Sequence, residues 1–201
     1  MRNLLALGLA LTASIARGAD LSVAVVDALE RPLPGAVVYL TGAGLAPRAD
    51  PPVVVIDQKN KQFEPRISVI PAGTSVTFPN SDQIRHSVYS FSPAKTFSLK
   101  LYSGKPASPV VFDKPGLVVL GCNIHDKMAA WLFVVDTSAY AQAGANGQAV
   151  LRNISPGSYM LYVWYPGVDD GPVAQKITVA AQDAPLRRVH LEVRPIGEVL
   201  P

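Results

Sequence analysis

Cysteine and histidine are both scarce in this sequence, which has one cysteine and three histidines among 201 residues. A lone cysteine cannot form a disulfide within the chain. Cys122 is therefore a reactive thiol, a link to another chain or a metal ligand, unless it is only a small buried apolar side chain. Any metal site built on Cys122 has to draw its imidazole ligands from His86, His125 and His190.

Charge is also sparse, with 18 lysines and arginines against 15 aspartates and glutamates and a net charge of +3. The basic residues are scattered and form no run that could follow a phosphate backbone, so nucleic-acid binding is not expected. Long stretches of helical periodicity are missing after the N-terminus. Instead, 18 prolines and 15 glycines separate short runs of alternating apolar residues, which predicts an all-β fold.

The N-terminus lacks an apolar run long enough to cross a membrane. Arg2 is followed by an apolar segment at 4–15 that falls short of the ~20 residues of a transmembrane helix. Small residues follow, which allow cleavage after Gly18 or Ala16. We therefore predict a signal peptide at 1–18, a periplasmic or secreted product and no stable membrane span in its mature form. A retained membrane anchor is the alternative.

The stretch GCNIHDKM places Cys122, His125 and Met128 at successive intervals of three residues. A thiolate, an imidazole and a thioether form a soft ligand set that selects copper. Two histidines and one cysteine with a weak axial methionine describe a blue-copper electron-transfer site. The second histidine has to come from elsewhere in the chain. His86 is the natural candidate, because it lies where a turn-rich segment leads into a strand, whereas His190 is expected to be exposed on a sheet.

Many short strands are expected, separated by turn residues, and this spacing is typical of a β-sandwich or barrel. The clearest runs are 21–27, 36–42, 86–91, 96–102 and 129–136. Farther along the chain, alternation places Tyr159, Leu161 and Val163 on one face of a strand.

The middle segment, 52–136, resembles the cupredoxins, the small blue-copper proteins. The residues that carry the resemblance are Phe63-Glu64-Pro65, Gly73, Val76, Phe78, Asn80, Asp82, His86, Phe112-Asp113, Pro115-Gly116, Cys122, His125 and Met128. The resemblance implies a Greek-key β-sandwich that holds one type 1 copper ion. His86, Cys122 and His125 would be its strong ligands and Met128 its axial ligand.

Two further expectations concern the surroundings of this site. Cupredoxins often have an asparagine after the first histidine that ties the two ligand segments together. Ser87 occupies that position here and can form a similar hydrogen bond with a shorter reach. Phe78, Phe112 and Trp131 are expected to cover the site and limit the access of water. The alternative for each of them is ordinary core packing.

The flanking segments resemble a carboxypeptidase-regulatory-like domain, a small immunoglobulin-like or transthyretin-like β-sandwich. Residues 25–40 are similar to its first hairpin and residues 144–164 to its later strands. We therefore predict a discontinuous sandwich made of 19–50 and 137–201, into which the cupredoxin domain at 52–136 is inserted. This combination also resembles methylamine utilization proteins, which implies a possible context and no particular substrate.

Three functions fit the sequence. The chain is an electron carrier that works with a redox partner protein, a copper-handling protein without such a partner, or a β-sandwich binding or scaffold protein. An enzyme is not expected, since four protein ligands would leave no open position on the metal for a substrate. No catalytic residues are assigned.

Overall fold

The computed structural model describes residues 18–47, 50–106, 108–169, 171–182 and 185–194. These residues form seventeen strands, joined by turns and loops. The prediction of an all-β sandwich fold is confirmed. No helix among the described residues is long and apolar enough to cross a membrane. The predicted signal peptide at 1–18 lies outside the described residues except for Gly18.

The middle of the chain forms one sandwich with its own apolar core. Its larger sheet has the order β6 (Ile67–Pro71), β12 (Ala129–Val135), β11 (Gly116–Gly121), β8 (His86–Ser92) and β9 (Lys95–Tyr102). Its smaller sheet has the order β10 (Val110–Phe112), β7 (Thr74–Thr77) and β3 (Val53–Val55), and a hairpin joins β4 (Asp57–Lys59) to β5 (Gln62–Glu64). Alternate residues of its strands face inward. The side chains buried in its core include Phe63, Phe78, Phe112, Leu120 and Leu132. We call this part the middle sandwich.

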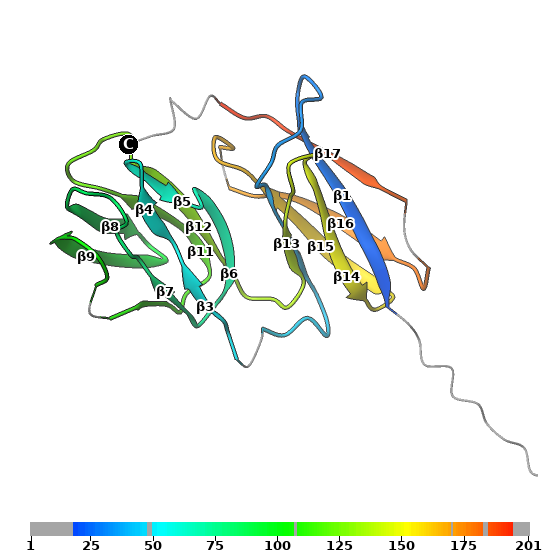
Figure 1. Cartoon of the computed structure of the whole chain (residues 1–201). Helices are drawn as coiled ribbons and strands as arrows, with labels where there is room; N and C mark the ends of the chain where they lie inside the picture. The colour runs from blue at the N-terminus through cyan, green and yellow to red at the C-terminus, as the bar shows by residue number, and fades with distance from the viewer. Residues whose placement is uncertain (1–17, 48–49, 107, 170, 183–184, 195–201) are drawn as a thin grey trace, which may run out of the picture.

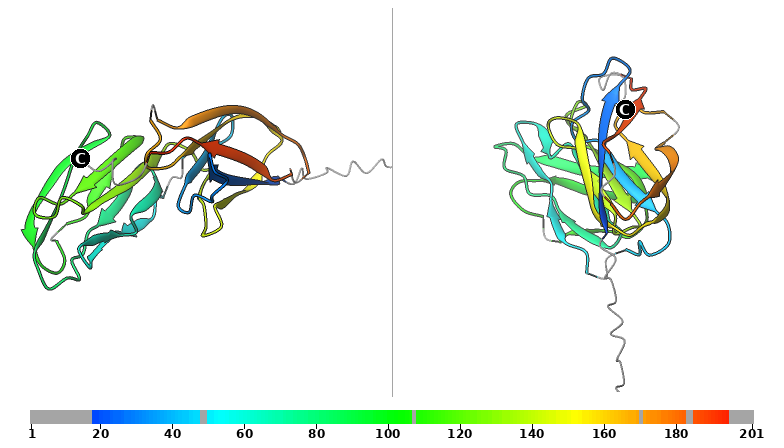
Figure 2. Two further views of the ribbon diagram at one scale, coloured as in Figure 1. Left: turned by 90° about the horizontal axis from the view of Figure 1, so that it is seen from above. Right: turned by 90° about the vertical axis from the view of Figure 1, so that its right-hand side faces the viewer.

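The two ends of the chain together form a second sandwich, which we call the flanking sandwich. One sheet has the order β14 (Gln148–Ile154), β1 (Ala19–Asp27) and β17 (Arg187–Leu191). The other has the order β13 (Tyr140–Gln142), β2 (Val37–Thr41), β15 (Gly157–Trp164) and β16 (Val173–Val179). Strands before residue 42 thus pair with strands after residue 139, and the two sandwiches lie side by side (Figures 1 and 2). The exact division of the chain into domains stays a prediction.

Strand β12 joins the two sandwiches because both of its faces are buried. Its even-numbered residues Ala130, Leu132 and Val134 point into the core of the middle sandwich. The odd-numbered residues Trp131 and Phe133 belong to a separate cluster that includes Val37 and Trp164 of the flanking sandwich. Successive side chains of a strand point to opposite faces. Because both faces of β12 are covered, all seven of its residues are buried.

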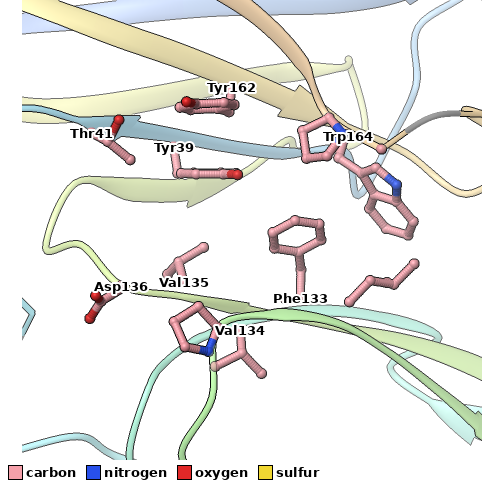
Figure 3. Close-up of a pocket in the computed structure, with 13 residues that line it drawn as sticks. Tyr39, Thr41, Phe133, Val134, Val135, Asp136, Tyr162 and Trp164 are labelled. Atoms are coloured by element: carbon pink, nitrogen blue, oxygen red, sulfur yellow. The ribbon is translucent and has the colours of Figure 1, made fainter. Parts of the chain in front are cut away.

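Aromatic rings fill the contact between the sandwiches. The Phe133 ring lies 5.6 Å from that of Tyr39 and 5.4 Å from that of Trp164, measured between centroids (Figure 3). The Gln142 side chain adds a polar link by donating to the Ile67 carbonyl over 2.8 Å. An open crevice of about 450 Å³ runs beside these rings, and none of the candidate metal ligands lines it.

Candidate metal centre

Three predicted ligands converge at one end of the middle sandwich. His86 begins β8, Cys122 directly follows β11, and β8 and β11 are neighbours in one sheet. The ligand atoms of His86, Cys122 and His125 all lie within 4.8 Å of one another, so these residues could hold a metal ion. His86 and Cys122 are buried, whereas His125 is partly exposed.

The loop after β11 positions its residues through two successive turns. The amide of His125 donates to the Cys122 carbonyl over 3.4 Å, and the amide of Met128 donates to the His125 carbonyl over 2.9 Å. The first turn thus runs from Cys122 to His125, and the second runs from His125 to Met128. Met128 is 1% exposed and belongs to the same buried cluster as Cys122.

Gly121, the last residue of β11, has no side chain and leaves room for the Tyr89 ring of β8. The Tyr89 ring lies against Gly121, and a Cβ atom added there would be 2.6 Å from the ring carbon Cζ. A larger residue at position 121 would therefore require the Tyr89 side chain to move.

The His86 ring is oriented by contacts on both of its nitrogens. Its Nε2 lies 2.8 Å from Oδ2 of Asp82, and its Nδ1 lies 3.7 Å from the Cys122 Sγ. Two ligand atoms bound to one metal ion at roughly 2.0 to 2.3 Å are themselves about 3.5 to 3.8 Å apart. The separation of Nδ1 and Sγ therefore fits a shared metal ion.

The His125 ring supports the same interpretation. Its Nδ1 is buried and has no hydrogen-bond partner among the described residues. A buried polar atom without a partner normally costs roughly 1 to 3 kcal/mol, which a metal ion would remove by binding the lone pair. The His125 and His86 rings have centroids 5.0 Å apart and are inclined by 57°. The donor set thus fits a soft metal ion such as copper.

Ser87 links the two ligand segments. Its Oγ accepts a hydrogen bond from the Asn123 amide over 2.9 Å and lies 3.8 Å from the Cys122 Sγ. Ser87 is fully buried, so water does not compete for these contacts. The short serine side chain reaches across because β8 and β11 are adjacent, in agreement with the role expected for this position.

The Asp82 carboxyl is the charged group in direct contact with the cluster. Burial opposes its ionisation. Hydrogen bonds from the Lys61 amide, the His86 ring and the Asn60 amide outweigh burial and hold the pKa of Asp82 below its ordinary value. Asp82 therefore stays ionised at neutral pH and can act only as a hydrogen-bond acceptor.

A second polar group beneath the site was not foreseen from the sequence. The Tyr102 hydroxyl donates to the Phe78 carbonyl over 2.5 Å and accepts from the Gln58 side chain over 2.5 Å. Burial raises the pKa of Tyr102 to about 12, although the hydrogen bond with Gln58 acts in the opposite direction. No local sequence pattern pairs Gln58 with Tyr102, because they lie on separate strands 44 residues apart.

The predicted aromatic cover stays a prediction for Phe78 and Phe112. Phe78 and Phe112 belong to the buried cluster that contains Cys122 and Met128. The prediction for Trp131 is wrong, because this residue occupies an odd position of β12 and faces the flanking sandwich. Its ring contacts the Arg66 guanidinium at 5.5 Å instead.

His190 lies on the flanking sandwich, as the exposed strand histidine that the sequence predicts. It belongs to β17, its side chain is 52% exposed, and its Nε2 contacts the Glu30 carboxylate at 2.5 Å. It does not belong to the cluster of His86, Cys122 and His125.

No protein-family model matches the chain, and no curated protein matches it. Solved structures that are similar include a purple cupredoxin from Nitrosopumilus maritimus, with 22% identity and a TM-score of 0.36 over 42% of this chain and 100% of that one. A copper-containing nitrite reductase from Thermus scotoductus has 24% identity and a TM-score of 0.40 over 56% of this chain and 28% of that one. A Cu(I) amicyanin variant has 22% identity and a TM-score of 0.36 over 48% of this chain and 99% of that one. Cupredoxin neighbours thus cover about half of the chain, and at these TM-scores the likeness carries no argument about function.

Proposed function

We propose that this protein is an exported type 1 copper protein that carries single electrons between redox partners. The observation that supports this most is the cluster of His86, Cys122 and His125, whose ligand atoms lie within 4.8 Å of one another. Two imidazoles and one thiolate are the strong ligands of a blue-copper site, and Met128 is the axial ligand in this proposal. Copper bound there would supply a one-electron Cu(I)/Cu(II) couple.

The protein's own residues would keep this site rigid and dry. Ser87 and Asp82 orient Cys122 and His86, and the apolar cluster that includes Phe78 and Phe112 excludes water from one side. Ligands held in place by such contacts need to move little when the charge on the metal changes, which favours rapid electron transfer. With three strong protein ligands and an axial methionine, no position is left for a substrate, so the proposed role is not catalytic.

The partly exposed His125 gives the site an outlet to the surface. Ile84 and Ile124 next to the ligands are 40% and 49% exposed. We assign this end of the middle sandwich to contact with a redox partner protein. The flanking sandwich would act as a carboxypeptidase-regulatory-like scaffold, and the whole protein would work in the periplasm or outside the cell.

Spectroscopy of histidine variants tests this proposal with a matched control. The mature protein loaded with Cu(II) should show an intense blue band, narrow copper hyperfine splitting and reversible one-electron voltammetry. Replacing His86 by alanine should open a strong-ligand position to water and convert the spectra to those of ordinary Cu(II). His190→Ala removes the histidine of the flanking sandwich and should leave all three signals unchanged.

Each other outcome points elsewhere. A colourless protein that holds Cu(I) and exchanges electrons slowly would favour copper handling over electron transfer. The absence of stoichiometric copper would favour a β-sandwich scaffold. Unchanged spectra in His86→Ala would contradict the proposed ligand set.

A further inference from the structure

The Asp82 carboxylate lies on the side of His86 that faces away from Cys122. Its Oδ2 is 2.8 Å from the His86 Nε2, and the side chains of His86 and Asp82 are 0% and 14% exposed. An ionised carboxylate accepts hydrogen bonds and cannot donate them, so the His86 Nε2 has to carry the proton. The lone pair of the neutral ring is then on Nδ1, the atom that faces the Cys122 Sγ at 3.7 Å.

The carboxylate is itself held by the hairpin that joins β4 to β5. Its Oδ1 accepts from the Asn60 amide over 2.7 Å, and its Oδ2 accepts from the Lys61 amide over 2.9 Å. Asn60 and Lys61 have φ angles of 54° and 58°, which are the left-handed values of a two-residue type I′ turn. This turn points two successive amides toward Asp82, so the carboxylate has little freedom to rotate.

Asn80 fixes the main chain that carries Asp82. Its side-chain oxygen accepts from the Asp82 amide over 3.0 Å. Its side-chain amide donates to the carbonyls of Ile84 and Tyr102 over 2.9 and 2.8 Å. Asn80 is 5% exposed, so these bonds are shielded from water. The loop before His86 is thus tied both to β9 and, through Asp82, to the β4–β5 hairpin.

We propose that Asp82 is a positioning residue whose hairpin-held carboxylate fixes the His86 ring and lowers the reduction potential of bound copper. This inference rests on the proposed copper site. A carboxylate that accepts the Nε2 proton makes the imidazole a stronger donor through Nδ1, as it does in other metal sites where a carboxylate supports a histidine ligand. A stronger donor and an added negative charge both stabilise Cu(II) more than Cu(I), so the potential falls.

The test is the reduction potential of Asp82→Asn, which removes the charge and keeps a side chain of the same shape. Loss of such a supporting group typically lowers metal affinity 10- to 100-fold. Cu(II) affinity should fall by about that factor and Cu(I) affinity by less. A tenfold difference between the two oxidation states corresponds to a rise of ~59 mV in potential. Asp82→Glu keeps the charge and should give a smaller rise.

Two control variants isolate the contact with His86. Asp57→Asn also removes one negative charge, from the β4–β5 hairpin that holds Asp82. Asp57 bonds to the Gln58 amide and the Ser81 hydroxyl instead of a ligand. Lys61→Gly removes a positive charge while keeping the amide that holds Asp82, and glycine tolerates the φ of 58°. Both controls should shift the potential much less than Asp82→Asn.

Nitrogen NMR of the copper-free protein provides a readout that is independent of copper. The His86 ring should carry its proton on Nε2, and that proton should exchange slowly with solvent. In Asp82→Ala the exchange should become fast and the two ring tautomers should mix. A proton on Nδ1 in the unaltered protein would overturn the proposal whether or not copper binds.

The combined outcomes separate this proposal from the proposed function. A blue protein in which Asp82→Asn shifts the potential no more than Asp57→Asn would overturn the role of Asp82 and leave the copper site intact. An unaltered protein that shows no blue band would overturn the proposed function, and with it the effect on potential. In that case the NMR result alone would decide whether Asp82 fixes the ring.

Discussion

The two sandwiches of this molecule are both all-β, but they bury different kinds of residue. The described residues of the middle sandwich bury Gln58, Ser68, Thr74, Asn80, His86, Ser87 and Ser90, whereas those of the flanking sandwich bury only Asp27 and Thr137 among polar side chains. A buried polar group is costly unless it is hydrogen-bonded. A core that contains many such groups therefore needs a reason beyond stability.

The partners of these groups differ as well. Asp27 accepts from the Leu29 and Arg31 amides, and Thr137 accepts from the Ala139 amide, so both support local turns. In the middle sandwich, Thr74 and Ser90 also form local bonds. Ser87 and Asn80 instead bond to Asn123 and Tyr102, which lie 36 and 22 residues away. Buried polar groups that connect distant segments hold a site in place, whereas local ones only shape the chain.

The largest effect is expected from replacing Cys122 by serine, which changes a proposed metal ligand and leaves the flanking sandwich unaltered. The blue band should disappear, because it arises from the bond between copper and the thiolate and a hydroxyl is a hard, poorly ionised donor. Cu(II) affinity should fall by more than the 10- to 100-fold typical of a residue that only supports a ligand. Visible spectra and copper titration measure both. A variant that remained blue would remove Cys122 from the ligand set.

Replacing one buried leucine by alanine in each core should destabilise the protein by a similar amount. The two changes should differ in their effect on the spectrum of bound copper. Leu151 of the flanking sandwich and Leu120 of the middle sandwich are 1% and 0% exposed. Each change to alanine should cost about 2 to 5 kcal/mol of unfolding free energy. Only Leu120→Ala should alter the blue band, because β11 leads directly into Cys122.

Calorimetry and denaturant unfolding, followed alongside the blue band, check this pair. If Leu151→Ala changed the copper spectrum as much as Leu120→Ala, the flanking core would be part of the site. The contrast between the sandwiches would then fail.

A smaller effect is expected for Met128→Leu, a swap that nearly conserves volume and should cost less than about 1.5 kcal/mol. The three strong ligands remain, so copper should stay bound and the protein should stay blue. The potential should rise, because loss of a weak donor favours Cu(I). Voltammetry measures the shift, and Met160→Leu in the flanking sandwich is the matched control. Loss of copper as complete as in Cys122→Ser would make Met128 a primary ligand, as in a Cu(I) transport site.

Local patterns predicted the parts of this structure that depend on short-range spacing. The three-residue intervals of Cys122, His125 and Met128 became two consecutive turns, and alternation placed Tyr159 and Leu161 correctly in the flanking core. The cover predicted for Trp131 was wrong for a simple reason. Alternation shows that a strand has two faces, but it does not show that both faces are covered by other parts of the protein. Here the contact between the sandwiches covers the second face.

Two other features escaped prediction for different reasons. The β4–β5 hairpin has Lys61 where glycine usually provides the second left-handed residue of a type I′ turn, so its sequence signal is weak. Asp82 was named only among the residues that resemble a cupredoxin. Its bond with His86 joins residues four apart in a loop that is not helical, so no helical spacing indicates this contact. Only the path of the loop brings those two side chains together.

The most direct test of the proposed copper site is anomalous X-ray scattering at the copper edge from crystals of the copper-loaded protein. We expect one strong peak within bonding distance of the Nδ1 atoms of His86 and His125 and of Sγ of Cys122, with Met128 beside it. A peak at the Glu30 and His190 pair of the flanking sandwich, with none at Cys122, would contradict it.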